Sequence, residues 1–355
     1  MRYTWLVLGI LSACLFQQAY ADSIDPDSAA RWFGGLPARE LPGLIEGPTS
    51  DRWVAYSSEF ERRWEDFRER QLLAAQTFSK KKLRSKHAVI YYMFGGPDFP
   101  FADAFFPDAS VYVLSGLEPV TDPSRLGDVI RSANALSRLH ASLGGYLKRG
   151  FFKTEDMREG SGFAGVTPLL MALVARSGGK LAAVSTFHLG EDGQLNFDGQ
   201  TTDRTDGLRI DFVDSRARTK LLYYFAVNLA DGSNRLDAFL RFCARTGDGD
   251  ALLKSASYLL HENNFSHLRR FLLDHSLVLL EDDSGIPLRY LRDEHWKLEL
   301  FGNYLAPIGQ FEKYFQPELA SMPQPQRSGR YSFETGYLGQ IGGSHFLLAR
   351  RRVSQ

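Results

Sequence analysis

The sequence predicts an α/β fold: a mixed, mainly parallel, three-layer sheet with some antiparallel strands, preceded by a long amphipathic helix near the N-terminus. Apolar runs of strand length alternate with helical patterns along most of the chain, which is typical of parallel sheets with crossover helices. Aromatic residues recur at three- and four-residue steps between residues 50 and 83, and this spacing predicts the long helix. Two apolar runs joined by charged residues, 208–213 and 221–228, predict an antiparallel pair.

The first 21 residues predict a secretory signal peptide. Arg2 precedes an apolar run from Thr4 to Phe16, and Ala19-Tyr20-Ala21 supplies small residues for cleavage before Asp22. The run is too short to remain as a membrane anchor, so we expect a periplasmic or secreted protein. The alternative is a membrane-anchored lipoprotein, because residues 11–14 resemble a lipobox ending in Cys14.

Residues 22–86 form the predicted N-terminal helical segment. Pro26 suits the first turn of a short helix that ends at Phe33, and the glycines and prolines of 34–48 predict a loop. The long helix then runs from Ser50 to Leu83, and a basic cluster closes it, as suits the negative end of a helix dipole. The stripe consists of Trp53, Tyr56, Phe60, Trp64 and Phe67.

Residues 87–355 form the predicted α/β domain, with no repeat and no clear break. The expected strands are His87–Phe94, Val111–Leu114, Leu181–Leu189, Leu208–Val213, Leu221–Asn228, Leu277–Leu280, Lys297–Phe301 and Phe346–Ala349. The expected helices are Asp103–Phe106, Arg125–Leu147, Thr167–Ala175 and two or three within Asn234–His275, where Lys254, Ser257, Tyr258 and His261 share one helical face. Residues 321–330 are an expected loop.

Composition narrows the range of partners. The formal net charge is zero, and 44% of residues are hydrophobic, so we expect a globular protein that binds no nucleic acid and has no transmembrane segment in its mature chain. Export separates the chain from ATP, NAD and S-adenosylmethionine, and we expect no cofactor. No H-E-x-x-H is present, and the acids of 193–207 do not fit a calcium loop, so we assign no metal ligands.

The first candidate site follows the strand at 87–94. Gly95, Gly96 and Asp98 lie in the turn Phe94-Gly-Gly-Pro-Asp98, and Glu118 follows the next strand, 23 residues after Gly95. Dinucleotide-binding sheets place a ribose-binding acid at about this distance, and the layout resembles that of nucleotide-binding and methyltransferase sheets. The motif G-x-G-x-x-G is absent, however, and Pro97 lacks the N–H that a phosphate would need. The alternative is a tight turn with solvated acids.

The second candidate site follows the strand at 277–280. Asp283, Ser284 and Arg289 lie in Leu280-Glu-Asp-Asp-Ser-Gly-Ile-Pro-Leu-Arg-Tyr290 and offer groups that bind a sugar or a metal. The alternative is that Asp283 and Ser284 cap the turn through Gly285, which is the usual role of Asp-Ser-Gly.

The segments Phe94-Gly-Gly-Pro-Asp-Phe99, Leu117-Glu118-Pro119 and Asp282–Tyr290 resemble those of a group of uncharacterised exported bacterial proteins. The resemblance extends from about His87 to the C-terminus. It implies export, and it assigns no catalytic residue.

Three functional hypotheses follow. The first is an exported protein that binds a small or polymeric ligand in a cleft at the carboxyl ends of its strands, where Gly95, Asp98, Glu118 and Asp283 form one site. The second is a hydrolase that uses Asp98, Glu118 or Asp283 as acid, base or metal ligand. The third is an envelope assembly factor that has no catalytic activity.

Overall fold

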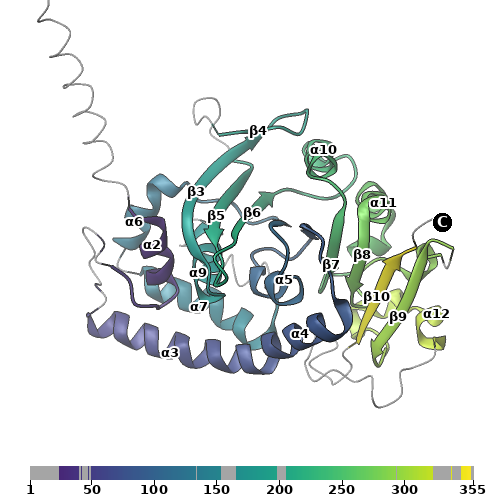
Figure 1. The fold of residues 1–355 in the computed structure, drawn as a ribbon, viewed down its shortest axis with the longest axis horizontal. Helices are drawn as coiled ribbons and strands as arrows, with labels where there is room; N and C mark the ends of the chain where they lie inside the picture. The colour runs from purple at the N-terminus through teal and green to yellow at the C-terminus, as the bar shows by residue number, and fades with distance from the viewer. Residues whose placement is uncertain are drawn as a thin grey trace, which may run out of the picture.

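A ten-stranded sheet forms the centre of the computed structural model (Figure 1). The structure describes residues 24–322 except 40, 42–46, 48, 133, 153–164, 198–204 and 293, together with 337 and 345–352. The strands lie in the order β4-β3-β5-β6-β2-β1-β7-β8-β10-β9. Their bounds are β1 Val89–Tyr92, β2 Val111–Gly116, β3 Lys180–Leu189, β4 Leu195–Asn196, β5 Gly207–Val213, β6 Thr219–Ala226, β7 Gly249–Leu253, β8 Ser276–Glu281, β9 Trp296–Gly302 and β10 His345–Arg351.

The five central strands, β6, β2, β1, β7 and β8, are parallel to one another. β1 is buried along its whole length, which is why its sequence is apolar without alternation. Ile90 and Tyr92 belong to one apolar cluster, while Val89, Tyr91 and Met93 belong to another. Because successive side chains of a strand point to opposite faces, the two clusters lie on opposite faces of the sheet.

Helices cover both faces (Figure 1). One apolar cluster joins the sheet to α2, α3, α5, α7 and α9, and the other joins it to α10 and α11. The bounds are α2 Pro26–Phe33, α3 Asp51–Phe67, α4 Leu73–Phe78, α5 Phe99–Phe105, α6 Leu126–Ile130, α7 Ala135–Arg149, α9 Thr167–Arg176, α10 Leu236–Thr246, α11 Ser266–His275 and α12 Pro317–Ser321.

Shorter helical turns connect these elements. Two π-helical turns lie on either side of α4, namely η1 Arg68–Leu72 and η2 Ser79–Leu83. The 3₁₀ turns are η3 Pro123–Arg125, η4 Leu259–His261, η5 Asn263–Phe265, η6 Leu288–Tyr290 and η7 Gly309–Tyr314.

The outer strands are antiparallel, so the prediction that most strand pairings are parallel is wrong. Among the described strands, four pairings are parallel and five are antiparallel. The predicted antiparallel pair is present as β5 and β6. The short turn between β5 and β6 returns the chain antiparallel to the neighbouring strand, whereas parallel pairing needs a crossover connection.

The predicted helix 50–83 is present as α3, η1, α4 and η2 in succession. Ser50 caps it, since its hydroxyl accepts a hydrogen bond from the Trp53 amide at 3.2 Å. The aromatic stripe is buried in the same apolar cluster as the sheet. Phe67 contacts the rings of Phe101 and Tyr146, so this helix packs onto the α/β core.

β7 is the main element that the sequence analysis missed, because residues 234–275 were expected to be entirely helical. Gly249–Leu253 forms a buried strand between β1 and β8. Gly249 permits the pairing, since a Cβ there would lie 2.4 Å from the Val89 carbonyl oxygen. The expected helical face from Lys254 to His261 is also wrong, because left-handed backbone conformations follow β7 directly. A short apolar run does not by itself distinguish a strand from a helix.

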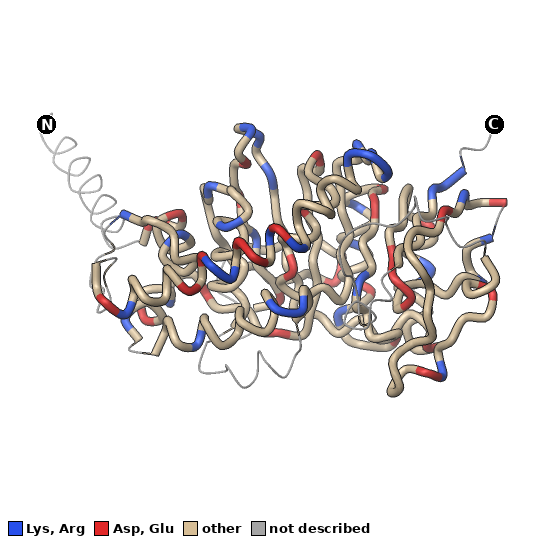
Figure 2. The backbone as a smooth tube through the Cα atoms, turned by 90° about the horizontal axis from the view of Figure 1, so that it is seen from below, with Lys and Arg blue, Asp and Glu red and all other residues tan. Residues whose placement is uncertain are grey.

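Lysine, arginine and acidic residues are dispersed along the chain rather than gathered on one side (Figure 2). In the described part of the chain, no helix is long and apolar enough to cross a membrane. The predicted signal peptide, Cys14 and nearly all of the predicted loop at 321–330 lie outside the described residues.

Removing the Phe67 ring tests whether α3 is part of the core. We expect Phe67→Ala to lower the free energy of unfolding by about 3–5 kcal/mol, the range for deleting a fully buried aromatic ring. The measurement is urea unfolding followed by circular dichroism. Val54→Ala on the exposed side of α3 is the control, with an expected change within about 0.5 kcal/mol. Equal stability of the two variants would contradict the packing described.

Candidate functional site

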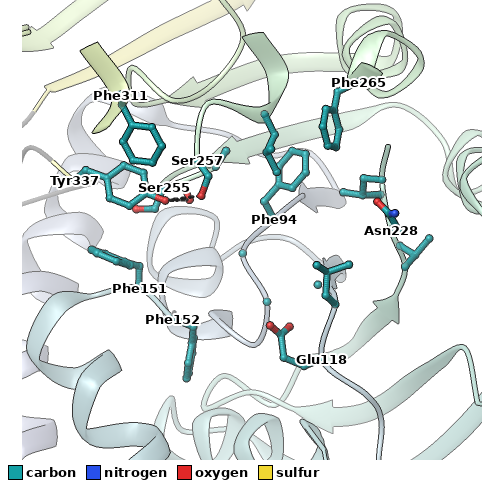
Figure 3. Close-up of a pocket in the computed structure, with 18 of the residues that line it drawn as sticks. Phe94, Glu118, Phe151, Phe152, Asn228, Ser255, Ser257, Phe265, Phe311 and Tyr337 are labelled. Carbon is teal, nitrogen blue, oxygen red and sulfur yellow. Dashed lines mark hydrogen bonds between the residues drawn. The ribbon is translucent and has the colours of Figure 1, made fainter. Parts of the chain in front are cut away.

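A pocket of about 620 Å³ lies at the carboxyl ends of the parallel strands (Figure 3). Its wall includes residues directly after β1 (94–96), β2 (117–118), β6 (227–229) and β7 (255–259). In chain order, the parallel strands lie as 3-2-1-4-5, and this order reverses direction between β1 and β7. Open α/β sheets bind ligands at such a switch point, because the two loops there diverge to opposite faces and leave a crevice.

Three glycines let the first two loops approach each other closely. A Cβ on Gly95 would lie 2.8 Å from the Tyr92 ring, and one on Gly116 would lie 2.3 Å from the Glu118 carboxylate. Gly96 has a positive φ of 57° and donates its amide to the Ser115 carbonyl at 3.0 Å. Because these glycines have no side chain, the ends of β1 and β2 can lie in close contact.

Glu118 is the one charged side chain among the described residues that line the pocket. Its carboxylate points into the open space in Figure 3. The Tyr224 hydroxyl donates to it at 2.9 Å and lies 3.1 Å from its backbone carbonyl. Burial and the neighbouring Glu118 carboxylate raise the pKa of Tyr224 well above its usual range, so this hydroxyl stays a donor.

Six of the remaining residues of the described wall are aromatic, and five more are aliphatic. The rings surround the open space in Figure 3 and come from segments far apart in the chain: Phe94, Phe151, Phe152, Phe265, Phe311 and Tyr337. Polar groups are few, and they are contributed by Asn228, Ser255, Ser257 and Gln310. An apolar pocket with a few oriented polar groups is the usual form of a small-molecule site.

Asp98, predicted as a ligand-binding or catalytic residue, is not part of the described pocket wall. Its side chain is buried and forms an ion pair with Lys254, whose Nζ lies 3.0 Å from a carboxylate oxygen. The hydroxyls of Tyr92 and Tyr146 donate to its two oxygens at 2.6 and 2.7 Å. Burial raises the pKa of Asp98, while Lys254 opposes that rise. Because every oxygen is engaged inside the protein, the carboxylate is turned to the core.

Lys254 connects three segments that build the pocket. It follows β7, pairs with Asp98 in the loop after β1, and donates to the Gly150 carbonyl at 2.6 Å, directly before Phe151 and Phe152. Its ammonium also lies 4.2 Å from the centre of the Phe101 ring. In the sequence, Lys254 is distinguished only by its helical spacing with Ser257, Tyr258 and His261, and this spacing carries no signal for the observed role.

Asp283 and Ser284, the second predicted group, are also absent from the described wall. Both are buried behind it, where the Asp283 carboxylate accepts from the Tyr258 hydroxyl and the Ser284 hydroxyl accepts from the Ala256 amide at 2.8 Å. Asp282 caps the turn, since it accepts from the Ser284 amide at 2.9 Å. The turn-capping alternative therefore describes this segment, although Asp282 and not Asp283 is the capping acid.

These acids support a strained corner of the wall. Ser255, Ser257 and Tyr258 all have φ between 53° and 57°, a conformation that costs energy for residues other than glycine. The Asp282 carboxylate accepts from the Ser255 amide at 2.9 Å. On the pocket side, the Tyr337 hydroxyl lies 2.7 Å from the Ser257 hydroxyl. Strain of this kind persists only where the surroundings hold it, and it is frequent at ligand sites.

Arg289 lies away from the described pocket wall, exposed on η6, with its guanidinium 4.9 Å from the centre of the Tyr290 ring. The expected single site of Gly95, Asp98, Glu118 and Asp283 is thus divided. Gly95, Gly96 and Glu118 face the pocket, while Asp98 and Asp283 support its walls from behind. In the described part of the chain, no group of three or more histidine, cysteine or acidic side chains could hold a metal ion.

Replacing Lys254 tests its role as the connection between pocket segments. We expect Lys254→Met to lower the free energy of unfolding by about 3–5 kcal/mol, because Asp98 stays buried without its counter-charge. We also expect faster amide hydrogen exchange in all three segments, 94–98, 150–152 and 254–258.

Lys220→Met is the matched control, since Lys220 is equally buried and pairs with Asp103 at 3.0 Å away from the described pocket wall. It should lower stability without loosening those segments. Faster exchange confined to 254–258 in Lys254→Met would show that the lysine does not connect them.

Asp283 predicts a dependence of stability on pH. Burial, and then the neighbouring Asp282 charge, raise the pKa of Asp283 from 3.8 to about 7. The folded protein therefore binds a proton that the unfolded chain has lost, and this contribution to stability disappears as pH rises from 3.8 to about 7. We expect Asp283→Asn, which is neutral throughout, to flatten the fall in unfolding free energy by about 1 kcal/mol per pH unit in that window.

Urea unfolding at several pH values measures this slope. The exposed Asp274→Asn is the control and should retain the wild-type slope. An unchanged slope in Asp283→Asn would mean that its carboxyl group is not protonated in the folded protein.

Comparison with known proteins gives no relative on which to base an assignment. The chain matches no family model, no curated protein and no solved structure. The 3-2-1-4-5 order of its parallel strands is the order of dinucleotide-binding sheets. A shared strand order concerns topology alone, so the function of this chain has to be argued from its pocket.

Proposed function

We propose that this protein binds a small, non-phosphorylated ligand in the pocket at the carboxyl ends of its parallel strands. The observation that carries the proposal is a pocket at the switch point of the sheet whose one charged side chain, among the described residues, is Glu118. In dinucleotide-binding folds, an acid at the end of the second strand accepts hydrogen bonds from ligand hydroxyls, and Glu118 follows β2 in the same way.

The loop after β1 is unsuited to phosphate. Phosphate sites offer free backbone N–H groups and positive charge. Here the amides of Gly96, Asp98 and Phe99 donate to the carbonyls of Ser115, Gly95 and Pro97, and Pro97 has no N–H. Glu118 adds a negative charge beside this loop. A ligand with a ring and hydrogen-bond donors therefore fits better than a nucleotide.

This proposal includes the finer features expected from the sequence. We infer a three-layer domain over residues 87–355 and an exported chain, periplasmic or secreted, with a lipoprotein anchored through Cys14 as the alternative. Arg2, the apolar run and Ala19-Tyr20-Ala21 support export. Export would separate the chain from nucleotide cofactors, and this agrees with a pocket whose described wall has no phosphate-binding loop.

A carboxylate-dependent hydrolase is less well supported. Paired-acid hydrolysis needs two carboxyl groups about 5–10 Å apart around the substrate. Asp98 and Asp283 are engaged behind the wall, so the described pocket offers Glu118 without a second acid. A pocket lined by six aromatic side chains likewise favours ligand binding over an assembly factor without a cleft function.

A thermal-shift screen tests the proposed function. We expect nucleosides, sugars or small amines to raise the melting temperature, and their phosphate esters to fail, because Glu118 repels the added negative charge. At a concentration of 100 times the dissociation constant, a ligand adds about 2.7 kcal/mol of stability. Glu118→Gln should reduce the shift, while the exposed Glu191→Gln should not.

Stabilisation that is stronger for the phosphate esters, or that is equal in Glu118→Gln and the wild type, would contradict the proposed function. The unliganded melting temperature of Glu118→Gln separates a loss of binding from a loss of fold.

A further inference from the structure

The charge of Glu118 has no counterpart in the described pocket. Its carboxylate receives a hydrogen bond from the neutral Tyr224 hydroxyl, and no lysine, arginine or histidine lines the described wall. The carboxylate of Asp98, by contrast, is paired with the Lys254 ammonium and accepts hydrogen bonds from the hydroxyls of Tyr92 and Tyr146. Among the described wall residues, Glu118 is thus a carboxylate with no positively charged neighbour.

Aromatic rings surround the space that this carboxylate faces. In Figure 3, Phe151 and Phe152 lie on one side of the open space and Phe94 lies across from them. Further rings extend the wall, with Tyr337 5.1 Å from Phe311 and 5.4 Å from Phe151 between ring centroids. The face of an aromatic ring carries partial negative charge and attracts cations.

We infer that the ligand of this pocket is an organic cation, such as a substituted ammonium, whose charge lies between Glu118 and the surrounding rings. The inference rests on the proposed function and narrows its ligand class. A cation gains from the carboxylate and from the ring faces together. A neutral polyol also hydrogen-bonds to Glu118, but it leaves the negative charge of the pocket uncompensated when it displaces water.

No histidine of the described wall supplies a positive charge opposite Glu118. The described histidines nearest to the wall by sequence are His261 and His267, each two residues beyond a wall residue, and neither lines the described wall. Burial lowers the pKa of His261 to about 4, so it is neutral at physiological pH. A positive charge opposite Glu118 therefore has to come from the ligand or from outside the described wall.

The test compares matched pairs of a cation and its neutral carbon isostere on the full mature chain. Choline and 3,3-dimethylbutan-1-ol have the same shape and differ in charge, and benzyltrimethylammonium fills more of the pocket. Titration calorimetry or ligand-observed NMR gives the dissociation constants. We expect the cation to bind about 10-fold more tightly than its isostere, which corresponds to about 1.4 kcal/mol.

Two variants test whether the preference for cations comes from the Glu118 charge and from the aromatic rings. Glu118→Gln should weaken cation binding about 10-fold and leave the neutral isostere within about twofold, because it removes charge and keeps the shape. Phe152→Leu should weaken the cation more than the isostere, since it removes a ring face and keeps an apolar side chain. Glu191→Gln, outside the pocket, should change neither.

The outcomes separate this inference from the proposed function. Binding of neutral ring compounds or polyols with no preference for cations, or a cation preference that survives in Glu118→Gln, overturns the cationic ligand and leaves the proposed pocket intact. Failure of the cations, the isosteres and the broader screen alike overturns both.

Discussion

The buried ion pair between Asp98 and Lys254 is the contact on which the candidate site depends. Burying two charges is costly, and the protein offsets this cost with two tyrosine hydroxyls on Asp98 and a carbonyl and a ring on Lys254. Replacing such a pair by apolar side chains of similar volume often leaves the free energy of unfolding unchanged or raises it. The ionic pair instead fixes geometry. Its hydrogen bonds hold the loop after β1, the end of α7 and the loop after β7 in one arrangement.

The second support of the pocket lies in the acids after β8. Asp282 holds the Ser255 amide, Asp283 holds the Tyr258 hydroxyl, and both stabilise a corner with three left-handed residues. The energy stored in that corner is balanced by hydrogen bonds from a neighbouring strand end. The chemistry of the site is thus arranged in two shells. A largely apolar wall with one carboxylate among its described residues faces the pocket, and a layer of buried charges fixes the position of that wall.

The sequence predicted the elements better than it predicted their roles. The continuous apolar run of β1 and the aromatic stripe of α3 carry strong periodic signals, and the glycines beside Glu118 pointed to the crevice. β7 was missed because its five residues are too few to show a period. Asp98 and Asp283 are chemically indistinguishable from ligand-facing acids in a sequence, and only the position of a distant residue, Lys254 or Tyr258, determines their role. The wall residues Phe151, Phe311 and Tyr337 come from segments with no motif, so proximity in the fold is their only signal.

The walls of the pocket come from residues spread between 94 and 337, which affects when the site can exist. No short fragment of the chain contains the complete pocket, because the loops after β1 and β2 meet those after β6 and β7 only when most of the chain has folded. Such long-range closure is among the slower steps of folding. A chain that crosses a membrane unfolded would therefore assemble its pocket at its destination, and would first meet its ligand there.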